Sequence, residues 1–194
     1  MSCFPLGAIG AALVFGVLAL TATGRDKDRD TLTYRVPSES MRPTLELGDV
    51  LQIDTAAYDR DRRPRIGDIV LFEPPTGAQT NRCGRRPKEG QACGRPTPKR
   101  SVGLHLIKRV TATPGMTVQV IEGRVILNGK RQREPFIRAC ADSYDPQCNY
   151  PTPLKVAKGH YFVLGDNRAG SDDSRNWGPV PRGWIVGRAP VKSP

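Results

Sequence analysis

The stretch "EGRVILNGK", residues 122–130, has the pattern of a β-hairpin. A Gly turn leads into four residues rich in apolar side chains, and Asn-Gly follows, a dipeptide that favours a tight turn between antiparallel strands. After residue 24 no long segment repeats its apolar residues with the helical period of 3.6. The sequence therefore predicts an all-β domain, an antiparallel barrel or sandwich of short strands. Further β-type runs support this: "TLTYRV", "GDVLQID", "GDIVLFEP", "VGLHLIKRV", "MTVQVIEG" and "HYFVLGDN".

The length and composition fit one such domain. A chain of 194 residues suits a single core-bearing domain, and its 20 Gly and 18 Pro favour turns over long helices. The formal net charge of +11 is concentrated in a Gly/Pro-rich basic insert, about residues 76–101. We interpret the insert as a solvated loop; the alternative is a role in binding lipid head groups or in steering substrate.

The first 24 residues predict a transmembrane anchor. They carry no charged side chain, and "FPLGAIGAALVFGVLALTAT" is long enough to cross a bilayer as one helix. A cleaved signal peptide is the alternative, but a basic start and a good small-x-small cleavage site are both missing. A charged linker, residues 25–30, would connect the anchor to the β-domain over residues 31–194.

Four cysteines indicate the cellular compartment in which the domain lies. Cys83 lies near Cys93 and Cys140 near Cys148, both pairs in turn-rich stretches without the spacing of a zinc site. We predict two local disulfides and hence an oxidising compartment; four free thiols are the alternative. Three basic residues directly after the anchor favour a cytoplasmic domain instead. The cysteines carry more weight because large domains cross the membrane largely regardless of flanking charge.

The stretch "VPSESMRPTLELGDVL", residues 36–51, holds two candidate nucleophiles, Ser38 and Ser40. A serine hydroxyl is a poor nucleophile until a neighbouring base removes its proton. The two histidines of the chain, His105 and His160, are poorly suited, one within a predicted strand and the other after a Lys-Gly turn. A Ser-His-Asp triad is therefore the weaker alternative.

Lys108 in "VGLHLIKRV", residues 102–110, is the better candidate base. In an alternating strand it shares a face with Leu106 and Val110, where a core residue is expected. Burial lowers the pKa of a lysine amine by disfavouring its charged form. The alternative is an edge position from which the ammonium reaches water.

A third polar stretch, "VLGDNRAGSDDSRNWG", follows a predicted buried strand over residues 163–178. Many short polar side chains after a strand indicate a turn rich in local hydrogen bonds. The functional interpretation is a shell of residues that orients a catalytic base.

Together and in this order, the motifs resemble the bacterial type I signal peptidases, membrane-bound Ser-Lys endopeptidases that remove signal peptides after export. The resemblance covers about residues 30–190 and implies a signal-peptidase-like β-fold. It rests on "PSESMRPTL", "GDVL", "GDIVLF", "IKRVTATPG", "GDNRAGSDDSRNWGPVP" and "VGRA".

The resemblance assigns roles residue by residue. Ser40 becomes the nucleophile and Lys108 its general base. Ser38 supplies a hydroxyl to the oxyanion hole beside the backbone N–H of Ser40, and Ser171 hydrogen-bonds the lysine amine. Two further sets follow: Asp173 and Arg175 as a supporting ion pair, and Val36, Pro37, Met41 and Ile107 as the lining of pockets for small substrate residues at positions −1 and −3.

The resemblance also sets expectations about partners and place. The partners are preprotein signal peptides and inner-membrane lipid, with no nucleic acid, no metal and no cofactor, and the chain acts as a monomer. The expected place is the inner membrane, crossed once, with the catalytic domain on the extracytoplasmic face. The single anchor, the basic insert and "TATPGMTV" depart from the usual pattern. Two alternatives stay open: a dedicated peptidase of a conjugation or secretion system, and a non-catalytic basic module that binds nucleic acid or anionic lipid.

Overall fold

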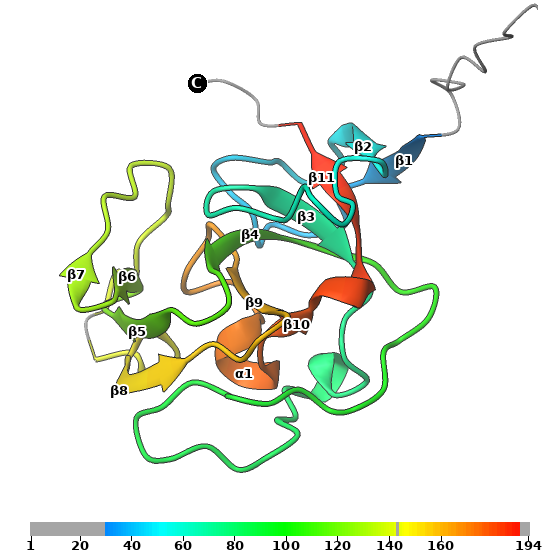
Figure 1. Ribbon diagram of the computed structural model, residues 1–194. Coiled ribbons are helices and arrows are strands. Elements are labelled where there is room, and N and C mark those ends of the chain that lie inside the picture. Colours follow the sequence, from blue (N-terminus) through cyan, green and yellow to red (C-terminus); the bar gives the residue numbers. More distant parts are fainter. Residues whose placement is uncertain (1–29, 143, 191–194) are drawn as a thin grey trace, which may run out of the picture.

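A seven-stranded antiparallel sheet carries most of the protein in the computed structural model, which describes residues 30–142 and 144–190. Figure 1 shows this sheet beside a smaller one of four strands. In spatial order the large sheet consists of β1 (Thr31–Arg35), β2 (Val50–Asp54), β11 (Ile185–Ala189), β3 (Ile69–Phe72), β4 (Leu106–Ala112), β9 (His160–Leu164) and β10 (Val180–Pro181).

The smaller sheet has the order β7 (Lys130–Arg131), β6 (Arg124–Leu127), β5 (Thr117–Ile121) and β8 (Tyr150–Lys155). Short helices lie between the strands: η1 (Ala78–Thr80), η2 (Pro146–Cys148), α1 (Ser174–Trp177) and η3 (Arg182–Trp184). Every pairing of these named strands is antiparallel, so the prediction of an all-β antiparallel domain is confirmed.

The hairpin that decided the fold class is present as β6 and β7. Asn128 and Gly129 join the two strands with φ angles of 50° and 79°, the left-handed conformation that a two-residue turn of this kind requires. The preceding turn from β5 to β6 has the same form, at Glu122 and Gly123, and the Glu122 N–H donates to Asn149 Oδ1.

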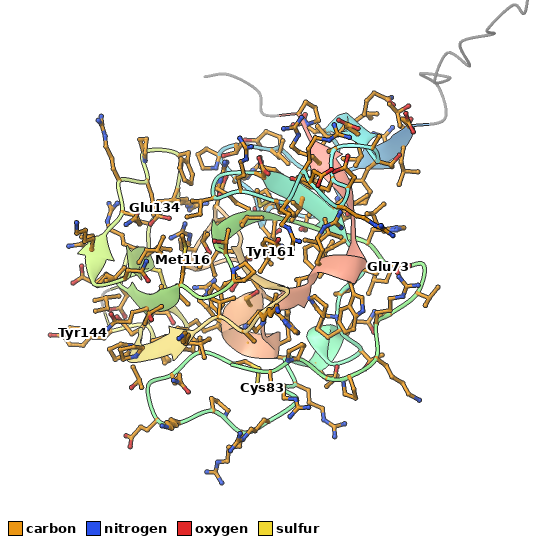
Figure 2. The ribbon with its side chains drawn as sticks, viewed as in Figure 1. Glu73, Cys83, Met116, Glu134, Tyr144 and Tyr161 are labelled. Carbon is orange, nitrogen blue, oxygen red and sulfur yellow. A yellow bond between two sulfur atoms is a disulfide. The ribbon has the colours of Figure 1, made fainter. Side chains whose placement is uncertain are left out.

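The two sheets share part of the apolar core. Ala112 of β4 and Phe162 of β9 pack with Val118, Val125 and Leu154 of the smaller sheet. Figure 2 shows Met116 where the chain passes from β4 into this sheet and Tyr161 in the interior. A second apolar cluster joins the segment between β1 and β2 to residues of β2, β3 and β4.

The basic insert, residues 76–101, differs from the solvated loop we expected. Its charged side chains are exposed, but its backbone is docked: the Thr152 N–H donates to Gly90 O, the Cys93 N–H donates to Arg175 O, and Ala92 is buried in the core. Apolar burial and backbone hydrogen bonds therefore fix the path of a segment that composition alone describes as a loop.

Both predicted disulfides are present. Cys83 and Cys93 join within the insert with Cα atoms 5.7 Å apart, and Cys140 and Cys148 join with Cα atoms 6.4 Å apart. The first bridge closes the base of the loop that runs along the bottom of Figure 2, where Cys83 is labelled.

The predicted anchor, residues 1–24, lies outside the described residues, as do residues 25–29 of the linker. Over residues 30–142 and 144–190, no helix combines the length and the apolar character needed to cross a bilayer.

Candidate active site

Ser40 lies in the segment between β1 and β2. Backbone hydrogen bonds and buried apolar side chains hold this segment in place. Reciprocal backbone bonds hold its base, with the Val36 N–H donating to Asp49 O and the Gly48 N–H donating to Val36 O, both at 2.8 Å. Met41 and Leu45 are wholly buried in an apolar cluster with residues of β2, β3 and β4. Since Met41 is the neighbour of Ser40, its packing fixes where the serine stands.

Lys108 comes to the same place from β4. Its Nζ donates a hydrogen bond to Ser40 Oγ at 2.7 Å, although 68 residues separate the two in sequence. Both side chains are buried, with 4% of Lys108 and 8% of Ser40 exposed. The prediction that Lys108 occupies a core position is confirmed. The strand is buried from Ile107 to Ala112, however, so burial extends to both faces and not only to the predicted one.

Burial sets the charge state of the lysine. Removal from water lowers the pKa of Lys108 from 10.5 to about 8, and the nearby Asp173 carboxylate opposes part of this shift. A substantial fraction of the amine is therefore neutral near pH 8 and has a lone pair able to accept a proton.

Ser38 also contacts the Ser40 hydroxyl. Its Oγ donates to Ser40 Oγ at 3.2 Å, and the residue is otherwise exposed. Within the described residues, no hydrogen bond engages the backbone N–H of Ser40. A hydroxyl and an N–H thus stand next to the candidate nucleophile as possible donors to an oxyanion.

Ser171 lies in the site, but its expected hydrogen bond is not formed. The Ser171 hydroxyl is buried and has no hydrogen-bond partner among the described residues, while the Lys108 amine donates to Ser40 Oγ. Gly165 explains how close the segments come: a Cβ on this glycine would lie 2.2 Å from Ser171 Oγ and 2.5 Å from the carbonyl oxygen of Ser40. The role of Ser171 stays a prediction.

Asp173 and Arg175 form the expected ion pair. Arg175 Nε donates to Asp173 Oδ1 and Nη2 donates to Oδ2, both at 2.8 Å, and both residues are buried. Burial alone would raise the pKa of Asp173, but the charge and hydrogen bonds of Arg175 hold it below its usual value. Arg175 also donates to the carbonyl of Ser171, and Asp173 accepts the N–H of Gly165, so the pair fixes both segments that approach Ser40.

A second polar cluster was not assigned from the sequence. Arg109, next to Lys108, donates twice to the buried carboxylate of Asp166, and Thr44 donates to the same carboxylate. Asn167 then donates its N–H to Ser40 O at 3.1 Å and its side-chain amide to Glu39 O at 3.3 Å. The cluster ties the Ser40 segment to the end of β9. Asp166 and Asn167 belong to the "GDN" run after the buried strand, which was the signal in the sequence for these two residues.

The histidines play no part in this arrangement. His160 Nδ1 hydrogen-bonds with Lys158 O, and no described hydrogen bond joins either His105 or His160 to Ser40. This geometry does not support the Ser-His-Asp alternative.

The four predicted pocket residues differ in exposure. Val36, Met41 and Ile107 belong to one apolar cluster and are nearly or wholly buried, whereas Pro37 is exposed. Met41 has no exposed surface, so its observed role is to support the loop from below. Contact of these residues with a substrate stays a prediction.

Comparison with known proteins identifies the family. The model of the family "Signal peptidase, peptidase S26" matches residues 10–193, and the chain therefore belongs to that family, as its motifs indicated. It is 39% identical over 158 residues to a signal peptidase I of Leptolyngbya laminosa, covering 81% of this chain and 66% of that protein. It is 31% identical over 180 residues to signal peptidase I V of Bacillus subtilis strain 168, covering 89% of this chain and 91% of that protein.

A solved structure of a signal peptidase I from Enterococcus faecalis aligns with 68% of this chain and 97% of that one, at 25% identity and a TM-score of 0.45. The chain spans 66% of the length of each of the first two curated relatives.

Proposed function

We propose that this chain is a membrane-anchored serine endopeptidase that removes N-terminal signal peptides from exported preproteins, cutting after small residues at positions −1 and −3. Membership of the family and the names of its relatives support this class of reaction. The observation that carries the proposal is the 2.7 Å hydrogen bond between the buried Lys108 amine and the Ser40 hydroxyl.

In the first step Ser40 attacks the scissile carbonyl. The neutral fraction of Lys108 accepts the hydroxyl proton, since its Nζ already lies at hydrogen-bond distance from Ser40 Oγ. A lysine with its ordinary pKa would be almost fully charged near neutral pH and could not take this proton. The buried site supplies the base by lowering the pKa to about 8.

The negative charge then develops on the carbonyl oxygen. In the proposed mechanism the Ser38 hydroxyl, 3.2 Å from Ser40 Oγ, and the Ser40 N–H donate hydrogen bonds to this oxygen. Loss of one such donor typically costs about 2.7–4 kcal/mol of transition-state stabilisation. Lys108, now an ammonium, returns its proton to the leaving amine. Water activated by the same amine releases the acyl group from Ser40.

The edge of β4 offers a place for the substrate backbone. Residues Leu106 to Arg109 pair with β3 on one side, but pairing with β9 on the other side begins only at Arg109. The described residues therefore leave one edge of Leu106–Lys108 without a strand partner. An extended peptide can add to such an edge, with its carbonyl beside Ser40 and its side chains toward Pro37 and Ile107.

The proposed location is the inner membrane, with the domain on the extracytoplasmic face. The apolar residues 1–24 support an anchor, and two disulfides within the described domain support an oxidising compartment. The intact Ser40–Lys108 contact favours an enzyme over the non-catalytic basic module.

Cleavage of an exported preprotein with an Ala-x-Ala site tests the proposal. The detergent-purified full chain should cut after the second Ala, as mapped by mass spectrometry, and the Ser40→Ala variant should not. Cleavage by both proteins at the same rate would show that Ser40 is not the nucleophile.

A further inference from the structure

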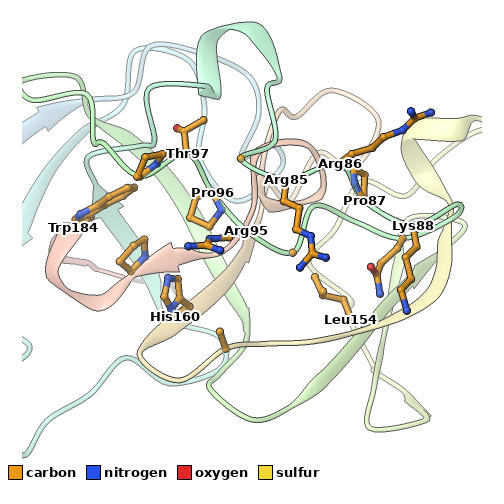
Figure 3. A pocket seen from close by; sticks show the side chains of 16 residues that line it. Arg85, Arg86, Pro87, Lys88, Arg95, Pro96, Thr97, Leu154, His160 and Trp184 are labelled. Carbon is orange, nitrogen blue, oxygen red and sulfur yellow. The ribbon is translucent and has the colours of Figure 1, made fainter.

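A groove of about 790 Å³ lies between the basic insert and the body of the domain (Figure 3). Residues of the insert between Gly84 and Pro98 form one side of it, and Leu154, His160 and Trp184 contribute to the other. We call this cavity the insert groove. Neither Ser40 nor Lys108 lines it, so it is separate from the site described above.

The charged side chains that line the insert groove are all basic. Arg85, Arg86, Lys88 and Arg95 line it and no Asp or Glu does. Among the described residues these four cations take part in no ion pair, although other arginines of the domain do. Figure 3 shows Arg85 and Arg95 reaching into the groove, with Lys88 toward one end and Trp184 at the other. The positive charge along the groove is thus uncompensated.

Much of the rest of the lining is apolar and suits a polypeptide, although Gln91, Thr97 and His160 also contribute. Four prolines (Pro87, Pro96, Pro98 and Pro181) line the groove together with Leu154 and Ala157. Such a surface packs against the backbone and aliphatic carbons of an extended chain. Trp184 is the one Phe, Tyr or Trp that lines it, whereas single-stranded nucleic acids are bound by successive aromatic platforms.

The groove is built rigidly. The Cys83–Cys93 disulfide closes the insert, and the Gln91 side chain donates to the carbonyl oxygen of Pro153 at 2.6 Å, next in sequence to the lining residue Leu154. The Cys93 N–H donates to Arg175 O at 2.8 Å. A ligand therefore meets a preformed surface and does not have to order a loop.

The position of the insert disfavours a lipid head group. β1, which directly follows the predicted anchor and linker in sequence, lies at the top of Figure 1, and the insert runs along the bottom. A membrane lying next to the start of β1 would be on the far side of the domain from the groove. A water-soluble partner fits this position better.

We propose that the insert groove binds an extended acidic segment of a partner polypeptide. Carboxylates of that segment pair with Arg85 and Arg95, and its backbone lies along the prolines and Trp184. Binding of this kind requires no peptide hydrolysis, so it goes beyond the proposed function and stands independently of it.

The test uses the full chain in detergent with Ser40→Ala, so that no probe can be cut. Fluorescence anisotropy follows binding of a rhodamine-labelled ten-residue peptide of alternating Glu and Pro, with the Gln-Pro peptide as neutral comparison. The groove variant carries Arg85→Glu and Arg95→Glu. The matched control carries Arg60→Glu and Lys130→Glu, which make the same charge change at exposed residues outside the groove.

The acidic peptide should bind more tightly than the neutral one, and its affinity should fall about tenfold in the groove variant and remain nearly unchanged in the control. Equal weakening in both variants would overturn the proposal, since only net charge would then matter. So would absence of binding to the folded Ser40→Ala protein. Binding of a single-stranded oligonucleotide or of phosphatidylglycerol vesicles that depends on Arg85 and Arg95 when peptide binding does not would replace it with another ligand.

Discussion

Gly165 approaches the carbonyl oxygen of Ser40 so closely that a Cβ on the glycine would lie 2.5 Å from it. The same Cβ would lie 2.2 Å from Ser171 Oγ. The end of β9 and the Ser40 segment are therefore in direct backbone contact. The N–H of the neighbouring Asn167 donates to the same Ser40 carbonyl. The position of the nucleophile thus depends on a residue without a side chain.

Gly165→Ala should lower kcat about a hundredfold, because a displacement of about 1 Å at a reacting group has that effect. Gly183→Ala is the matched control, since a Cβ there meets nothing within 4 Å. Steady-state kinetics on one preprotein compares the two variants. A Gly165→Ala enzyme as active as Gly183→Ala would show that the segments are not packed as described.

Lys108→Met should abolish cleavage without destabilising the domain. General-base catalysis contributes about 10²–10⁴-fold in rate, so activity should fall at least by that factor. The folded protein holds the lysine pKa about 2.5 below its usual value, which corresponds to a cost of about 3 kcal/mol at neutral pH that methionine avoids. Thermal unfolding should give an equal or higher Tm. A large drop in Tm would contradict the conclusion that burial of the Lys108 amine destabilises the folded protein.

The same shift predicts how stability depends on pH. Between about pH 8 and 10.5 the unfolded chain keeps the Lys108 proton and the folded protein has released it. The unfolded state then binds more protons, so this lysine makes the free energy of unfolding rise with pH over that window. The wild-type protein should gain stability relative to Lys108→Met between pH 8 and 10. A constant difference between the two would contradict the lowered pKa.

Asp173→Asn should destabilise the domain by about 3–5 kcal/mol, because it leaves the buried Arg175 guanidinium without its counter-charge. Asp59→Asn breaks an ion pair with Arg62 that is open to solvent and should change little. Thermal unfolding of the two variants side by side checks this. Similar losses of stability in both variants would show that the buried ion pair contributes no more to stability than the exposed one.

The Ser171→Ala variant tests separately whether the Ser171 hydroxyl contributes to stability and whether it contributes to catalysis. The Ser171 hydroxyl is buried without a partner among the described residues, so its removal should leave the Tm unchanged or slightly higher. If the hydroxyl orients the Lys108 amine in the substrate complex, kcat should fall while KM stays nearly constant. An unchanged kcat would remove Ser171 from the site.

Local patterns in the sequence predicted the strands and the base. The Asn-Gly turn was recognisable because its left-handed conformation restricts the residues allowed there, and Lys108 was recognisable because a lysine interrupts apolar positions. The resemblance was needed to choose Ser40 over Ser38, since no local rule separates two neighbouring serines.

The remaining features depend on contacts between distant segments. The cluster of Arg109, Asp166 and Thr44 forms only when three segments meet, and no spacing in the sequence predicts it. The docking of the basic insert was missed for the same reason. Its exposed charges dominate its composition, but its place is fixed by Ala92 and by backbone hydrogen bonds to Arg175 and Thr152.

The pH dependence of acylation tests the central claim most directly. Rapid-mixing experiments would follow the first turnover of a preprotein, with Ser40→Ala as blank. The acylation rate should rise with pH through a single ionisation near pH 8 and then level off, because only neutral Lys108 accepts the Ser40 proton. A rate independent of pH between 6 and 10, or one that still rises at pH 10 as for a lysine with its usual pKa, would contradict the assignment of Lys108 as the base.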